Sequence, residues 1–151
     1  MKLLLYIVIL ASVILFPVAG TDVGELLPVE VVAISEEDGI VTIRTDTEDS
    51  GQGTTLQAAI ADLKAGAAGV IYLDTAEYLL LEEGMGSWLD TIERHLKRSV
   101  QVCHAREGIS LEGIANFLSV HGSNVTLGTV SNTSKIPIVR EENGRYYLIE
   151  K

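Results

Sequence analysis

Two runs of β-branched residues stand near the start of the chain, at residues 28–35 (PVEVVAIS) and 40–45 (IVTIRT). Runs of this composition favour β-strands. The segment EEDG between them contains Asp38-Gly39, a dipeptide that tolerates the positive φ angles of a tight hairpin turn. We therefore expect the two runs to pair as an antiparallel hairpin.

A helix is predicted after the next polar segment. Residues 47–53 (TEDSGQG) have the composition of a loop, and Thr54 is placed to cap a helix while Gln57 returns the hydrogen bond three positions later. Four apolar residues then recur at helical spacing: Leu56, Ala59, Ile60 and Leu63. We expect this stripe to face a sheet and Gly66 to end the helix.

Two short apolar runs follow the helix. Residues 69–74 (GVIYLD) and 77–83 (EYLLLEE) are separated only by a tight polar break, and each is apolar without interruption. This pattern is typical of strands covered on both faces, so both are predicted to be central or nearly central. A second helix is predicted from Ser87 to about Arg98, ending in basic residues as the helix dipole prefers.

The remaining segments predict a strand, a helix and a hairpin. Residues 99–106 (SVQVCHAR) have the pattern of a strand, and residues 109–122 (ISLEGIANFLSVHG) that of a helix capped by Ser110. Residues 123–134 are expected to form a weakly ordered connection. The tail, residues 136–150, is centred on Asn143-Gly144, the dipeptide of a type I′ turn.

The two-residue turn fixes the predicted register of the terminal hairpin. Three cross-strand pairs follow from it: Glu142 with Arg145, Arg140 with Tyr147, and Val139 with Leu148. Opposite charges then meet at the turn, and apolar residues meet further in. Together these elements predict an α+β fold: one domain over residues 21–151, with a mixed sheet, about three helices and a C-terminal β-hairpin.

The first twenty residues (MKLLLYIVILASVILFPVAG) differ from the rest of the chain. Lys2 is their only charge, an apolar run extends to Phe16, and Pro17 precedes small residues. This order is typical of a secretory signal peptide, and cleavage is predicted between Gly20 and Thr21. The alternative is an uncleaved anchor, although the run is shorter than the roughly 20 apolar residues that span a bilayer. In either case the domain is expected to be exported and extracytoplasmic.

The chain is acidic and has one cysteine. It has 11 basic and 21 acidic residues, a net charge of −10, which becomes −11 when Lys2 is removed with the signal. Because such a chain is repelled by phosphate backbones, we expect no nucleic-acid partner. A lone cysteine excludes an internal disulfide. Cys103 lies in an apolar alternation, which favours a small buried side chain over a reactive thiol.

Few residues suggest catalysis or ligand binding. The segment GQG at 51–53 precedes a helix but lacks the lysine of a phosphate-binding loop, which favours a capping role. The histidines, at positions 95, 104 and 121, form no i, i+4 pair, and no CxxC is present. We therefore predict no metal site and no cofactor.

No nucleophile and base are paired by the sequence. Cys103 and His104 are neighbours on a predicted strand and so point to opposite faces. Asp74 follows an apolar strand and is the best candidate for a site carboxylate, although a turn-capping role with Thr75 is favoured. The fold could bring Asp74 and a histidine to a serine, but no GxSxG elbow marks such a site.

The order of segments over residues 25–118 resembles the N-terminal domain of the C subunit of bacterial spore germinant receptors, the Ger(x)C family. The resemblance is carried by ELLPVEVVAISEEDGIVTIRT, GQGTTLQAAIADLKAG, GVIYLDTAEYLLLEEG and SWLDTIERHLKRSVQVCHA. It implies a non-enzymatic extracytoplasmic module that docks to a membrane protein complex in spore germination or sporulation. It supplies no catalytic residues.

The sequence departs from that family in two respects. Family members carry a lipidated cysteine directly after the signal, where this chain has Gly20-Thr21, and they carry further domains after this one. We therefore expect a truncated or standalone relative. The alternative function is a small secreted hydrolase with a site near Asp74. The oligomeric state and the partner's identity are left open.

Overall fold

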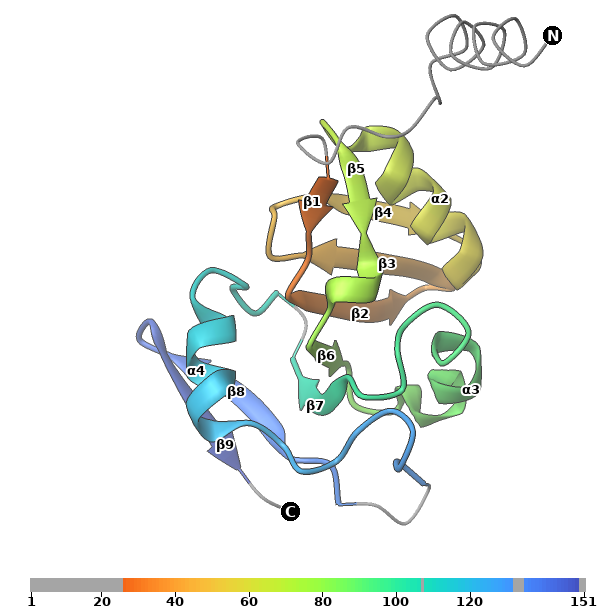
Figure 1. Ribbon diagram of the computed structural model, residues 1–151. Helices are drawn as coiled ribbons and strands as arrows, with labels where there is room; N and C mark the ends of the chain where they lie inside the picture. The colour runs from red at the N-terminus through yellow and green to blue at the C-terminus, as the bar shows by residue number, and fades with distance from the viewer. Residues whose placement is uncertain (1–25, 107, 132–134, 150–151) are drawn as a thin grey trace, which may run out of the picture.

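A computed structural model describes residues 26–106, 108–131 and 135–149 (Figure 1). The fold is α+β, as predicted. Seven strands form one mixed sheet in the order β4-β3-β2-β6-β7-β8-β9. Their bounds are Ser50–Gly53 (β4), Ile40–Thr45 (β3), Val31–Glu37 (β2), Tyr78–Leu81 (β6), Gln101–Ala105 (β7), Ile138–Glu142 (β8) and Arg145–Ile149 (β9).

Parallel strands form the middle of the sheet. β2, β6, β7 and β8 pair in parallel, whereas β3, β4 and β9 join by antiparallel pairing. β6 lies at the centre and all its residues are buried, which confirms the prediction for this apolar run. The chain has to leave and re-enter the sheet between parallel strands, so these pairs join residues far apart in sequence.

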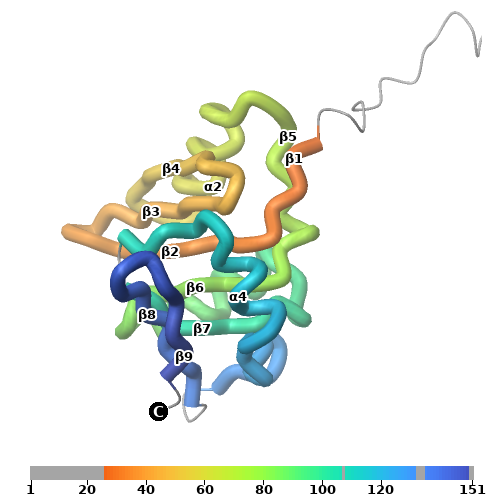
Figure 2. Tube along the Cα trace, turned by 90° about the vertical axis from the view of Figure 1, so that its left-hand side faces the viewer, coloured from red at the N-terminus to blue at the C-terminus, as the bar shows by residue number. Residues whose placement is uncertain are grey.

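Helices cover both faces of the sheet. α2 (Leu56–Gly66) and the short α3 (Leu89–Ile92) lie on one face, and α4 (Ile114–His121) lies on the other. Figure 2 looks onto the α4 face, with α2 behind the sheet. Each face has its own buried apolar cluster, because side chains alternate along the strands. Val32 and Leu79 belong to the cluster under α2, and Cys103 and Leu80 to the cluster under α4.

Both predicted hairpins are confirmed. β2 and β3 pair around Asp38 and Gly39, whose φ angles are 50° and 76°. β8 and β9 pair in the predicted register, with Glu142 opposite Arg145, Arg140 opposite Tyr147 and Val139 opposite Leu148. The positive φ angles of Asn143 and Gly144, 54° and 70°, are those that the turn requires.

The segment predicted as a loop before α2 contains an edge strand. Ser50–Gly53 pairs with β3 and forms β4, the end strand of the sheet. The helix cap is also one residue later than predicted: Thr55, not Thr54, accepts a hydrogen bond from the Ala58 N–H at 3.2 Å. The inward stripe of α2 is confirmed, since Leu56, Ala59, Ile60 and Leu63 are all buried.

The run at 69–74 is not a central strand. β5 (Val70–Tyr72) pairs only with β1 (Leu26–Pro28), in a separate two-stranded parallel sheet. Val70 and Tyr72 are each 44% exposed, and only Ile71 between them is buried. It is β6, the second apolar run, that pairs with β2.

Two predicted helices are shorter than expected. The second begins as a 3-10 turn, Met85–Trp88, and its α-helical part ends at Ile92 instead of Arg98. The third begins at Ile114 after Gly113, so Ser110 does not cap it. The predicted signal peptide and its cleavage point, Gly20 and Thr21, lie outside the described residues. Within those residues, no helix has the length and apolar character needed to cross a bilayer.

Candidate functional site

Asp74 is exposed in a 3-10 turn, Leu73–Thr75, between β5 and β6. The bonds that hold this turn come from Thr75, not from Asp74. The Thr75 hydroxyl accepts a hydrogen bond from the Val29 N–H at 2.9 Å and lies 2.7 Å from the Tyr72 carbonyl oxygen. These contacts tie the turn to the start of β2, and they account for the polar break between the two apolar runs.

Cys103 and His104 lie on opposite faces of β7, as predicted, so they form no dyad. The Cys103 thiol is buried in the α4 cluster, and burial raises its pKa to about 12. A thiol with this pKa is protonated at neutral pH and is a poor nucleophile. The half-buried His104 ring has its Nδ1 3.2 Å from the Leu81 carbonyl oxygen. Both residues therefore contribute to the packing and bonding of the central strands.

The other hydrolase candidates are bonded locally. His121 ends α4, is exposed, and has its ring 4.9 Å from that of Phe117. The Ser119 hydroxyl donates to the Asn116 carbonyl oxygen at 2.8 Å, and the Ser123 hydroxyl accepts from the Val125 N–H at 2.9 Å. No hydrogen bond between described residues joins a serine to a histidine or to Asp74, and no cluster suited to a metal ion is found among them.

The GQG segment packs against α2 and does not form an anion site. A Cβ atom at Gly51 would lie 2.3 Å from the Ala59 carbonyl oxygen, so glycine is needed for the close approach of the helix. The backbone N–H of Gln52 donates to an Asp62 carboxylate oxygen at 2.9 Å. A phosphate at this position would meet that negative charge, so the segment is suited to packing.

The terminal hairpin is anchored to the loop before α4. The Tyr146 hydroxyl donates to the Glu112 carbonyl oxygen at 2.8 Å, and a Glu141 carboxylate oxygen accepts from the Ser110 N–H at 2.9 Å. The Tyr146 ring also lies 5.7 Å from that of Phe117. Strand β9 is held in a defined position by these contacts, and it is an end strand of the sheet.

The face of β9 that points away from the α4 cluster carries exposed apolar side chains. Tyr147 and Ile149 are 47% and 39% exposed, on the face opposite to Tyr146 and Leu148, which pack on the core. Residues Glu142 and Arg145 flank the two-residue turn and exchange both hydrogen bonds. The N–H and C=O groups of Tyr146 and Leu148 therefore point away from β8, along the outer edge.

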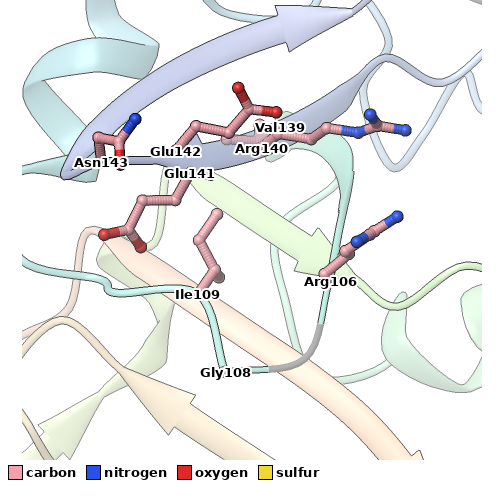
Figure 3. A pocket seen from close by; sticks show the side chains of 8 residues that line it. All are labelled: Arg106, Gly108, Ile109, Val139, Arg140, Glu141, Glu142 and Asn143. Atoms are coloured by element: carbon pink, nitrogen blue, oxygen red, sulfur yellow. The ribbon is translucent and has the colours of Figure 1, made fainter.

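A cleft lies on the other side of the hairpin, where β7 ends and β8 continues (Figure 3). Its volume is about 310 Å³. The lining residues are Arg106, Gly108, Ile109, Val139, Arg140, Glu141, Glu142 and Asn143. Four of these residues, Val139, Arg140, Glu142 and Asn143, were predicted from the sequence to be part of the hairpin, and none was predicted to line a binding site. One available signal was the placement of Arg106 directly after a strand, because side chains that follow parallel strands meet at one edge of the sheet.

Comparisons of the chain with protein-family models, with curated proteins and with solved structures find no match. What the chain binds is therefore inferred from the edge of β9 and from the cleft beside β8.

Proposed function

We propose that this chain is a non-enzymatic, extracytoplasmic binding module that docks to a membrane protein complex through the edge of β9. The observation that carries the proposal is the exposed outer edge of β9, an end strand whose Tyr146 contacts α4 and the loop before it. Such an edge binds an extended segment of a partner by strand addition, since its N–H and C=O groups have no partner in another described strand.

The partner segment would be extended and apolar at alternate positions. Main-chain hydrogen bonds to Tyr146 and Leu148 supply affinity, and apolar side chains of the partner cover Tyr147 and Ile149. The net charge of −10 favours a partner with a basic surface. Placement of this partner in a spore membrane depends on the resemblance to the germinant-receptor C subunit alone.

The hydrolase alternative has weaker support. It requires a serine, a histidine and Asp74 to meet, and the hydrogen bonds of Ser119, Ser123 and His104 go to local or neighbouring backbone groups instead. General base catalysis needs the base within about 3 Å of the proton that it removes, directly or through one water. No second observation favours a hydrolytic reaction.

The test is affinity capture of the full tagged chain from detergent-solubilised membranes of its native host. The double variant Tyr147→Lys, Ile149→Lys places two charges beside the edge, and lysines at such positions block strand addition. Val120→Lys is the matched control, because Val120 is 75% exposed and belongs to α4, not to the edge strand. We expect the double variant to lose the membrane partner, and both variants to keep the wild-type circular dichroism spectrum and melting temperature.

Equal capture by the double variant and the wild type would contradict docking through β9. A separate arm tests the absence of catalysis: Asp74→Asn, His104→Gln and His121→Gln, made singly, should leave the phenotype of the intact gene unchanged. Loss of that phenotype from Asp74→Asn in a folded protein would instead support the hydrolase. Deletion of the whole hairpin is a poorer test, because it removes β8, which pairs with β7 and buries Val139.

A further inference from the structure

The cleft between β8 and the loop after β7 contains two arginines. Arg106 follows the last residue of β7 and is exposed, and Arg140 lies on β8 and is half-buried. Figure 3 shows both guanidinium groups on the same side of the cleft, with the Glu141 carboxylate on the opposite side. The volume, about 310 Å³, is at the small end of the range for ligand pockets.

Neither guanidinium is neutralised by the part of the protein that the structure describes. No carboxylate oxygen of a described residue lies within 4 Å of Arg106 or Arg140, unlike the 2.7 Å pair of Arg98 and Glu93. The Arg140 Nε–H is buried and has no acceptor among these residues. A buried donor without an acceptor costs free energy, so its presence beside a cleft calls for an explanation.

The carboxylates of the cleft are directed elsewhere. Glu141 accepts a hydrogen bond from the Ser110 N–H at 2.9 Å, and Glu142 lies opposite Arg145 across the hairpin. Two guanidinium groups with no carboxylate of a described residue within 4 Å therefore line the cleft beside these two glutamates. Ile109 and Val139, both buried, form its apolar lining.

We propose that this cleft binds a ligand through a carboxylate, to which Arg106 and Arg140 donate hydrogen bonds. The planar guanidinium group matches a carboxylate in a two-point contact. A phosphate dianion is disfavoured, because Glu141 and Glu142 line the same small cleft and the net charge of the chain is −10. The apolar part of the ligand lies against Ile109.

The backbone of β8 offers a further contact in the cleft. Since Glu142 exchanges its hydrogen bonds with Arg145, the N–H and C=O groups of Glu141 point away from β9, toward the cleft. These two groups can form hydrogen bonds with the last peptide group of a peptide ligand whose carboxyl terminus lies in the cleft. A carboxylate can thus come from a free organic acid or from the carboxyl terminus of a peptide, and both present the same group to the arginines.

Isothermal titration calorimetry of the chain from residue 21 at low ionic strength tests the proposal. The probes are 3-methylbutanoate, an acetylated Ala-Val-Leu tripeptide with a free carboxyl terminus, its C-terminal amide, and inorganic phosphate. We expect at least one of the two carboxylates to bind more tightly than phosphate and the amide. Arg106→Gln and Arg140→Gln should each weaken that binding by about tenfold or more, as expected for hydrogen bonds to a charged group.

The matched control is Arg94→Gln, an exposed arginine outside the cleft, which should bind like the wild type. Binding of 3-methylbutanoate identifies a free acid as sufficient, and binding of the tripeptide acid alone identifies a peptide end. If Arg140→Gln fails to fold, the exposed Arg106 still provides the test. The proposal is overturned if no carboxylate binds, if phosphate or the amide binds equally well, or if Arg94→Gln weakens binding as much as Arg106→Gln.

Discussion

Replacement of Gly51 by alanine should destabilise the fold strongly, although the substitution adds a single methyl group. The new Cβ would lie 2.3 Å from both the Ala59 carbonyl oxygen and the Leu63 nitrogen, and 2.7 Å from the Leu63 Cα. Favourable contact between such atoms begins at about 3.5 Å. All three are backbone atoms of α2, so no side-chain rotation relieves the overlap. Either the helix or β4 has to move by about 1 Å.

Movement of α2 disturbs the buried stripe that the helix places on the sheet. Overpacking a core by one methyl group costs about 1–3 kcal/mol, and we expect a value near the upper limit because the obstacle is backbone on both sides. Gly66→Ala is the control in the same helix, since its Cβ would meet nothing within 4 Å. That variant should gain about 0.5–1 kcal/mol, because alanine loses less backbone entropy than glycine on folding.

Urea unfolding of the chain from residue 21, followed by far-ultraviolet circular dichroism, measures both changes. The two variants should move the midpoint in opposite directions at an unchanged slope. If Gly51→Ala unfolds within about 0.5 kcal/mol of the wild type, the packing of α2 on β4 described above is wrong.

Three further predictions concern the core. Leu63→Ala should lower the free energy of unfolding in urea by about 2–5 kcal/mol, because Leu63 is fully buried. The control Lys64→Ala, at the exposed neighbouring position, should change it by less than about 0.5 kcal/mol. A small effect at Leu63 would mean that the wrong face of the helix was assigned to the core. Burial raises the pKa of Cys103 to about 12 from its ordinary value of 9.0, so the thiol should resist Ellman's reagent at pH 8 until urea unfolds the protein. Between those two pKa values the folded state keeps a proton that the unfolded state loses, so the stability should fall as the pH rises above 9.0, and Cys103→Ala should remove that part of the slope. Fast labelling of the folded protein would contradict the burial of Cys103.

The local features of the fold were readable from the sequence. The register of β8 and β9 is set by Asn143-Gly144, because a two-residue turn leaves one way for the flanking residues to meet. The inward face of α2 follows from the spacing of Leu56 and Leu63, since 3.6 residues per turn place them on one side. In both cases the information lies within a few residues of the chain.

Other features were decided by contacts between distant segments. The polar segment at 50–53 became strand β4 because β3 offers it an edge, and Gly51 allows α2 to approach. The apolar run of β5 joined β1 instead of the main sheet, and its own residues carry no signal for that choice because a continuous apolar run fits either place.

The placement of Arg106 and Arg140 in one cleft was also decided by the tertiary structure. The two arginines are distant in sequence and share a cleft only because β7 and β8 pair in parallel and β8 continues past the end of β7. Parallel pairing needs a long connection, here through α4, and the chain pattern specifies each strand without specifying its neighbour. The sequence alone therefore determined most of the elements and both hairpins. The order of the strands, and with it the position of both proposed binding surfaces, follows from which apolar faces can be buried together.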